Sequence, residues 1–141
     1  MKRLIVVAAL AGAALACGAT DPQFDVSGQW DLVETFTNGT IDCDATGQLL
    51  LSQSSNGKQF TGSRFSSGSI CTGNPPTNFD PSPEAGLLGA EVVGAAVTMS
   101  IDFCDFVGTL ANESQMGGTI NCPNGLSGVQ EVFTGTWQAT R

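Results

Sequence analysis

Five cysteines and the absence of histidine set the chemistry that this sequence can support. Without histidine, the familiar catalytic triads and imidazole metal sites are excluded, and no serine lies in a nucleophile motif such as Gly-x-Ser-x-Gly. No two cysteines are close enough in sequence to form the ligand pair of a zinc site. We therefore expect disulfide bonds, and neither an enzyme nor a metal or cofactor site. The cysteines are Cys17, Cys43, Cys71, Cys104 and Cys122.

Residues 1–16 have the pattern of an export signal. Met1-Lys2-Arg3 is positively charged, residues 4–15 form an apolar run too short to span a bilayer, and small residues flank Leu15. We predict that this signal peptide is removed. The segment Ala13-Ala14-Leu15-Ala16-Cys17 resembles the lipobox of bacterial lipoproteins. That resemblance implies that Cys17 becomes the lipidated first residue of the mature chain; the alternative is ordinary cleavage, which leaves a free Cys17.

Lipidation of Cys17 would explain the odd number of cysteines. The other four form an even set that suits disulfides in an oxidising compartment. By resemblance to Gram-negative lipoproteins, Gly18 after Cys17 favours the outer membrane, with the protein facing the periplasm or the cell surface. We divide the chain into a signal peptide (1–16), a lipid-anchored tether (17–25) and a β-barrel domain (26–141).

The chain is acidic, with a formal net charge of −8 and only five Lys and Arg residues. A chain so poor in cations cannot neutralise phosphates, which argues against nucleic acid as a partner. Anionic lipid headgroups would repel it, so we expect attachment to a membrane to come from the lipid on Cys17 alone.

Apolar and polar residues alternate along most of the domain, which predicts an all-β fold. The predicted strands cover about residues 26–36, 47–53, 58–65, 87–93 and 97–103, the two arms of a hairpin over 104–122, and 129–140. Eight strands with mostly short connections favour a closed antiparallel up-and-down barrel, a meander without exposed sheet edges. A Greek-key sandwich is the alternative. In the fifth strand, Phe103 shares the inward parity of Met99.

The stretch from Cys104 to Cys122 reads almost as a mirror image of itself about Glu113. An antiparallel hairpin in this register favours a Cys104–Cys122 disulfide, and therefore Cys43–Cys71 as well. The alternative pairing is Cys71–Cys104 with Cys43–Cys122. In a meander, all four cysteines lie at the rim opposite the tether. The pairs that share one face are Leu110 with Met116, Gly108 with Gly118, Phe106 with Ile120, and Cys104 with Cys122.

Three longer connections, over residues 37–46, 66–86 and 123–128, are expected at the same rim. The connection over 66–86 holds four prolines and an isolated Phe79. Long segments without structure of their own are often lids or binding loops. We therefore predict a rim loop that Cys71 anchors.

Two segments resemble known small barrels. Gly28-Gln29-Trp30 resembles the Gly-x-Trp motif on the first strand of lipocalins and related calycins, in which a basic residue from the last strand covers the indole. Arg141 matches that residue and is expected to cap Trp30. The ending Gly135-Thr136-Trp137-Gln138-Ala139-Thr140-Arg141 resembles the terminal strand of avidin-like barrels, and the overall pattern is similar to small uncharacterised bacterial lipoproteins. These resemblances imply a lipocalin-like barrel that binds a small apolar or amphiphilic ligand.

The inward parity supplies the candidate ligand contacts. Glu34 shares this parity, but the sequence identifies no partner for it. The inward glycines either make room for a ligand or only let the strands coil tightly. If the barrel is filled, the alternative function is a non-catalytic surface or periplasmic interaction protein, whose disulfide-tied rim loops meet a partner. The candidate ligand-binding residues are Trp30, Phe60, Met99, Phe133 and Trp137.

Overall fold

The computed structural model describes residues 24–73, 84–124 and 131–141, and this part of the chain contains strands and turns only. It accordingly holds no helix of the length and apolarity needed to cross a membrane. The predicted signal peptide, Cys17 and most of the tether lie outside the described residues. The same is true of Phe79 and the four prolines of the predicted rim loop.

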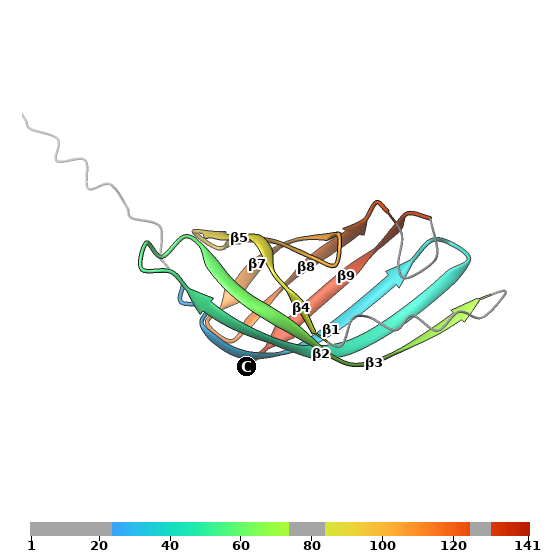
Figure 1. The fold of residues 1–141 in the computed structure, drawn as a ribbon, viewed down its shortest axis with the longest axis horizontal. Coiled ribbons are helices and arrows are strands. Elements are labelled where there is room, and N and C mark those ends of the chain that lie inside the picture. The colour runs from blue at the N-terminus through green and yellow to red at the C-terminus, as the bar shows by residue number, and fades with distance from the viewer. Residues whose placement is uncertain (1–23, 74–83, 125–130) are drawn as a thin grey trace, which may run out of the picture.

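One antiparallel sheet contains all the described strands, in the order β4-β3-β2-β1-β9-β8-β7-β6-β5. The strands are β1 (Gly28–Thr37), β2 (Ile41–Gln53), β3 (Phe60–Gly73), β4 (Glu84–Gly86), β5 (Leu88–Val93), β6 (Ala96–Ile101), β7 (Cys104–Asn112), β8 (Gln115–Cys122) and β9 (Phe133–Thr140). The first and last strands pair with each other, as closure of an up-and-down barrel requires. In Figure 1, β1, β2 and β3 form the lower wall of the barrel and β5 and β7 lie across from them.

The barrel is nearly closed by β4 and β5, which lie on either side of Leu87. β4 pairs with β3, while β5 pairs with β6. Across the seam, Leu87 N donates to the Gly62 carbonyl at 3.0 Å and Val92 N donates to the Lys58 carbonyl at 2.6 Å. These bonds leave little open edge between β3 and β5 in the part of the chain that the structure describes.

The predicted all-β antiparallel barrel is therefore confirmed, but the predicted number of eight strands is wrong, because the described residues form a sheet of nine. The predicted strand over 87–93 starts earlier and is interrupted at Leu87. The interruption follows from closure, since one half of this segment must pair with β3 and the other half with β6. Gly89, with φ of 56°, and a register shift between Leu88 and Glu91 accompany the change of partner.

The core follows the period-two pattern. On β1, Trp30, Leu32, Glu34 and Phe36 are buried while the residues between them are exposed. The matching residues of the other strands complete one hydrophobic core inside the barrel. Alternation along each strand thus places apolar side chains inside and polar ones in water.

The predicted hairpin register is confirmed. β7 and β8 pair Leu110 with Met116, Gly108 with Gly118 and Phe106 with Ile120. Disulfides join Cys104 to Cys122 and Cys43 to Cys71, the first of the two pairings that the sequence leaves open. Both disulfides lie at one end of the barrel, which we call the cysteine rim.

Two of the predicted rim connections contain strand residues in the part of the chain that the structure describes. β1 extends to Thr37 and β2 begins at Ile41, so the predicted connection over 37–46 shrinks to a turn at residues 38–40. Asn38 causes this, because its side-chain oxygen accepts hydrogen bonds from the backbone N–H groups of Thr40 and Ile41. β3 likewise continues to Gly73. Cys43 and Cys71 are consequently opposite residues of β2 and β3 rather than loop residues.

Phe103 does not join the core, contrary to its predicted inward parity. β6 ends at Ile101, and the turn that follows holds Asp102 at φ of 48° and Phe103 at φ of 68°. The turn rotates the Phe103 side chain out of the strand pattern, and 83% of it is exposed.

The inward glycines allow neighbouring strands to approach each other closely. A Cβ atom at Gly135 would overlap the carbonyl oxygen of Thr35, and one at Gly118 would overlap that of Val107. Gly47, Gly62 and Gly108 are equally crowded by a neighbouring strand. Of the two explanations that the sequence leaves open, tight strand coiling is therefore the one that these positions support.

Candidate functional site

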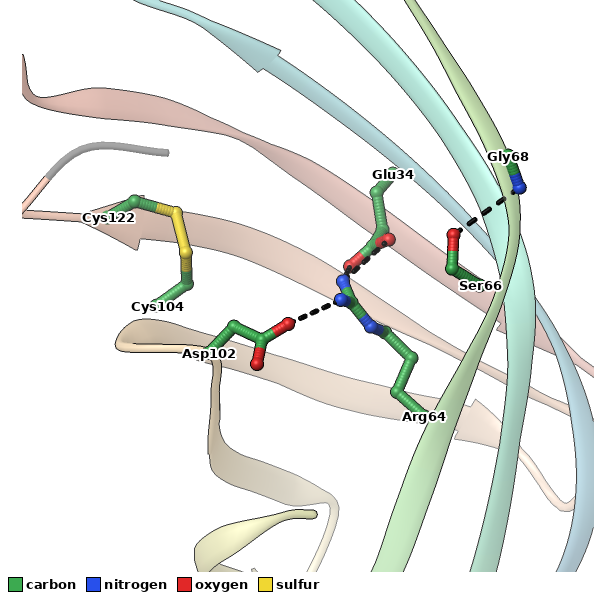
Figure 2. A network of polar contacts seen from close by, with 7 residues as sticks. All are labelled: Glu34, Arg64, Ser66, Gly68, Asp102, Cys104 and Cys122. Atoms are coloured by element: carbon green, nitrogen blue, oxygen red, sulfur yellow. Dashed lines mark hydrogen bonds and ion pairs between the residues drawn. A yellow bond between two sulfur atoms is a disulfide. The ribbon is translucent and has the colours of Figure 1, made fainter. Parts of the chain in front are cut away.

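A cluster of charged side chains lies inside the barrel near the cysteine rim. Glu34 of β1 and Arg64 of β3 are only 1% and 2% exposed. Asp102, in the turn between β6 and β7, reaches the same point from the other wall. Figure 2 shows Arg64 lying between the two carboxylates, with the Cys104–Cys122 disulfide on the Asp102 side. Buried charges are rare unless they are paired, so this arrangement is the first candidate for a functional site.

The two ion pairs of Arg64 differ in quality. Its Nη2 donates to Asp102 Oδ2 at 2.6 Å, a short charge-assisted bond. Its Nη1 lies 3.4 Å and 3.5 Å from the two carboxylate oxygens of Glu34, at the outer limit of hydrogen bonding. The Asp102 side chain is 31% exposed, whereas Glu34 is sealed inside. Glu34 thus keeps acceptor capacity that Arg64 does not satisfy.

Local sequence positions each member of the cluster. Arg64 continues the inward parity of Phe60 and Gly62 on β3, and Glu34 continues that of Leu32 on β1. The left-handed backbone at Asp102 turns its carboxylate toward the interior. Aspartate tolerates this conformation better than most residues.

Burial dominates the electrostatics of Glu34. Removal from water raises the pKa of its carboxyl above the ordinary value of 4.5, and the positive charge of Arg64 offsets only part of that effect. The negative charge of Asp102 adds a smaller increase in the same direction. When both carboxyls are ionised, two negative charges face one positive charge, which leaves one negative charge uncompensated.

Three buried side-chain polar atoms lack a hydrogen-bond partner among the described residues. They are Arg64 Nε, Ser69 Oγ and Trp137 Nε1. Glu34 lies directly opposite Trp137 on β9 and Ala45 on β2, and Ala45 lies opposite Ser69 on β3. Directly opposite residues present their side chains on the same face of a sheet. We call Glu34, Arg64, Ser69, Asp102 and Trp137 the interior polar site.

The five predicted ligand-binding residues are all buried in the one core. They do not form a single site, because they lie at different heights in the barrel. Trp137 is opposite Glu34 and belongs to the interior polar site. Phe133 lies at the cysteine rim, opposite Cys122. Trp30 and Phe60 lie toward the other end, and Met99 pairs with Phe106.

Arg141 covers Trp30 at the end of the barrel away from the cysteines. Its guanidinium carbon lies 4.4 Å from the centroid of the indole ring, the geometry of a cation–π contact. The same guanidinium donates to the backbone carbonyls of Asp25, Ser27 and Glu113. These contacts tie the start of the domain, the β7–β8 turn and the last residue together, so the contact has a structural role.

Sequence reasoning missed Arg64, although the signal was present. The alternation of Phe60 and Gly62 already places residue 64 inside the barrel, and Glu34 lacked a partner. An inward carboxylate and an inward cation in one small barrel are expected to pair, because each buried charge needs a counter-charge. Asp102 offered no such signal, because the parity of its strand puts it outside and only the turn brings it in.

Comparison with known proteins adds no assignment, because neither a scan against protein-family models nor a search of curated proteins finds a match. Within the described ranges, no three His, Cys, Asp or Glu side chains are grouped so that they could hold a metal ion. The interior polar site and the cysteine rim are therefore the two candidate functional regions of the described chain.

Proposed function

We propose that this protein is an exported, non-enzymatic β-barrel that binds a small amphiphilic ligand at the interior polar site. The observation that carries the proposal is the set of buried polar atoms without a partner on Arg64 itself, on the same strand as Arg64, and directly opposite Glu34. Buried polar groups are nearly always hydrogen-bonded, and leaving such a group without a partner costs about 1–3 kcal/mol. A ligand that supplies the missing partners would recover that free energy.

Apolar surroundings support an amphiphilic ligand. The Trp137 ring packs edge-on against Phe106 with centroids 6.0 Å apart, and Ile101 and Ile120 are buried in the same core. A polar head beside Glu34 and Arg64 would thus leave its apolar part among aromatic and aliphatic side chains. The Gly-x-Trp motif with its covering Arg141 and the resemblance to lipocalin-like barrels support the same function.

Tryptophan fluorescence tests this proposal directly. The chain has two tryptophans, so Trp30→Phe leaves Trp137 as the sole reporter, opposite Glu34. We expect the neutral probe N-phenylnaphthylamine to change Trp137 emission saturably, and Arg64→Met to weaken that binding. Lys58→Met, which removes an exposed cation, serves as the matched control. A folded protein without a saturable response to the probe would contradict the proposal.

The proposed location is the outer membrane, through a lipid on Cys17. The two disulfides support an oxidising compartment, and the resemblance of residues 13–17 to a lipobox supports the anchor. We expect Cys17→Ala to release the protein from the membrane fraction and to remove the mass of the lipid. Unchanged membrane retention of that variant would disprove lipid anchoring.

A second candidate function is the binding of a protein partner at the cysteine rim. Large exposed apolar side chains are present there, and the most exposed is Phe103 at 83%. The others at this end are Ile70, Leu88 and Val132. Under this alternative, Phe103→Ser would abolish binding to the partner and leave the response of Trp137 to N-phenylnaphthylamine unchanged.

A further inference from the structure

The geometry points to a neutral head group that both donates and accepts hydrogen bonds, a hydroxyl or a carboxamide, as the class of ligand that the interior polar site takes. Carboxylates and ammonium groups are disfavoured. This inference rests on the proposed function and concerns the polar end of the ligand only. It follows from three properties of the site, which are its charge, its free donors and its free acceptor.

The charge of the site disfavours an anionic head group. Arg64 is the one cation in the cluster, and it already lies between Glu34 and Asp102. A ligand carboxylate would bring a third negative charge into a buried site where ionic interactions are poorly screened. The formal charge of −8 on the whole chain also repels anions as they approach.

The free donors disfavour an ammonium head group. Arg64 Nε and Trp137 Nε1 each carry a hydrogen and can only donate, and neither has a partner among the described residues. An ammonium group has no lone pair and would leave both donors unsatisfied. The oxygen of a hydroxyl or an amide accepts such bonds.

Glu34 supplies the complementary acceptor. Its contacts to Arg64 Nη1 are 3.4 Å and 3.5 Å long, so its carboxylate can accept a stronger bond from a ligand. A hydroxyl or a primary amide offers an O–H or N–H in addition to its oxygen. Ser69 Oγ, which is also without a partner in the described chain, can adapt to either role. A neutral group with both functions therefore matches the site.

Four probes with the same alkyl chain separate these classes, namely octanol, octanamide, octanoate and octylammonium. Each is titrated at neutral pH into the Trp30→Phe protein with Trp137 emission as the signal. We expect octanol and octanamide to bind at least roughly tenfold more tightly than octanoate and octylammonium. Glu34→Gln should raise the affinity for octanoate by about tenfold relative to octanol, because it removes one negative charge.

Control variants keep the test decisive. Glu113→Gln removes a carboxylate in the exposed β7–β8 turn and should leave the selectivity unchanged. If Glu34→Gln fails to fold, Asp102→Asn removes the second carboxylate of the site and should also favour octanoate. Circular dichroism establishes that each variant is folded.

The outcomes distinguish this inference from the function on which it rests. Equal or tighter binding of octanoate, or tightest binding of octylammonium, would overturn the neutral head group and leave ligand binding intact. Selectivity for the neutral probes that persists unchanged in both carboxylate variants would also overturn the charge argument. Absence of binding by all four probes would overturn the proposed function itself.

Discussion

Glu34 brings a carboxyl group into the barrel interior, where its contacts with Arg64 are long. Burial therefore outweighs the attraction, and the pKa of Glu34 is raised in the folded protein. Between the unfolded value near 4.5 and the higher folded value, the folded state binds more protons than the unfolded state. The free energy of unfolding consequently falls as pH rises through that window.

The first prediction concerns this dependence. The side chain in Glu34→Gln cannot ionise. The free energy of unfolding of this variant, relative to that of the parent protein, should therefore increase as pH rises from acid to neutral. Arg64 and Asp102 face residue 34 in both proteins. Urea unfolding over a pH series measures the difference. Glu113→Gln, at the exposed end of the β7–β8 hairpin, should run parallel to the parent protein. A parallel profile for Glu34→Gln would contradict the argument.

The second prediction concerns Arg64. Arg64→Met leaves two carboxylates without their cation, one of them buried, and should lower the free energy of unfolding by roughly 3–5 kcal/mol at neutral pH. The loss should shrink in acid, where Glu34 is protonated. Lys58→Met, at an exposed position, should change stability by less than about 0.5 kcal/mol. Similar urea midpoints for the two variants would show that the buried pair has no such role.

At the scale of the elements, the β6–β7 turn stands out. Its two central residues, Asp102 and Phe103, both have positive φ, which is the geometry of a tight hairpin turn that favours Asn-Gly. A bulky residue in this region is strained, and strain is most often retained at functional sites. Asp102 holds Arg64, while Phe103 projects into solvent at the cysteine rim.

The third prediction follows from that strain. Phe103→Gly should raise the free energy of unfolding by about 1 kcal/mol, because glycine adopts positive φ without the clash that a side chain makes. Val93→Gly is the matched control, since Val93 is an exposed apolar strand residue outside the positive-φ set. That control should lose about 0.5–1 kcal/mol. Thermal unfolding of both variants measures the effect, and a loss in Phe103→Gly would refute the claim of strain.

At the scale of the whole molecule, two disulfides and the Arg141 contacts secure opposite ends of the barrel. The fourth prediction is that removing either disulfide, as Cys43→Ala with Cys71→Ala or as Cys104→Ala with Cys122→Ala, costs about 3 kcal/mol. The loops that they close, with sequence separations of 28 and 18, differ too little to separate the two losses. Chemical denaturation of the paired variants tests this, and an unaffected midpoint for either would contradict it.

Much of the fold is predictable from the sequence because its signals are local. Alternation along a strand depends on adjacent residues, and the β7–β8 register depends on a short mirror-image stretch. From these, the antiparallel barrel is predictable, and the Cys104–Cys122 pairing is favoured over its alternative. The Asn38 turn also rests on local hydrogen bonds, which the Asn38 side chain accepts from the backbone N–H groups of Thr40 and Ile41, so the predicted connection over 37–46 is longer than the observed turn.

The sequence by itself determined the inward and outward faces, the hairpin register and the aromatic core. Only the tertiary structure decided that strand pairing breaks at Leu87, that Phe103 faces water and that Glu34 meets Arg64 and Asp102. Glu34 and Arg64 are separated by 30 residues along the chain, and Arg64 and Asp102 by 38. Side chains so far apart in sequence meet only when the barrel closes, and closure depends on all the strands together.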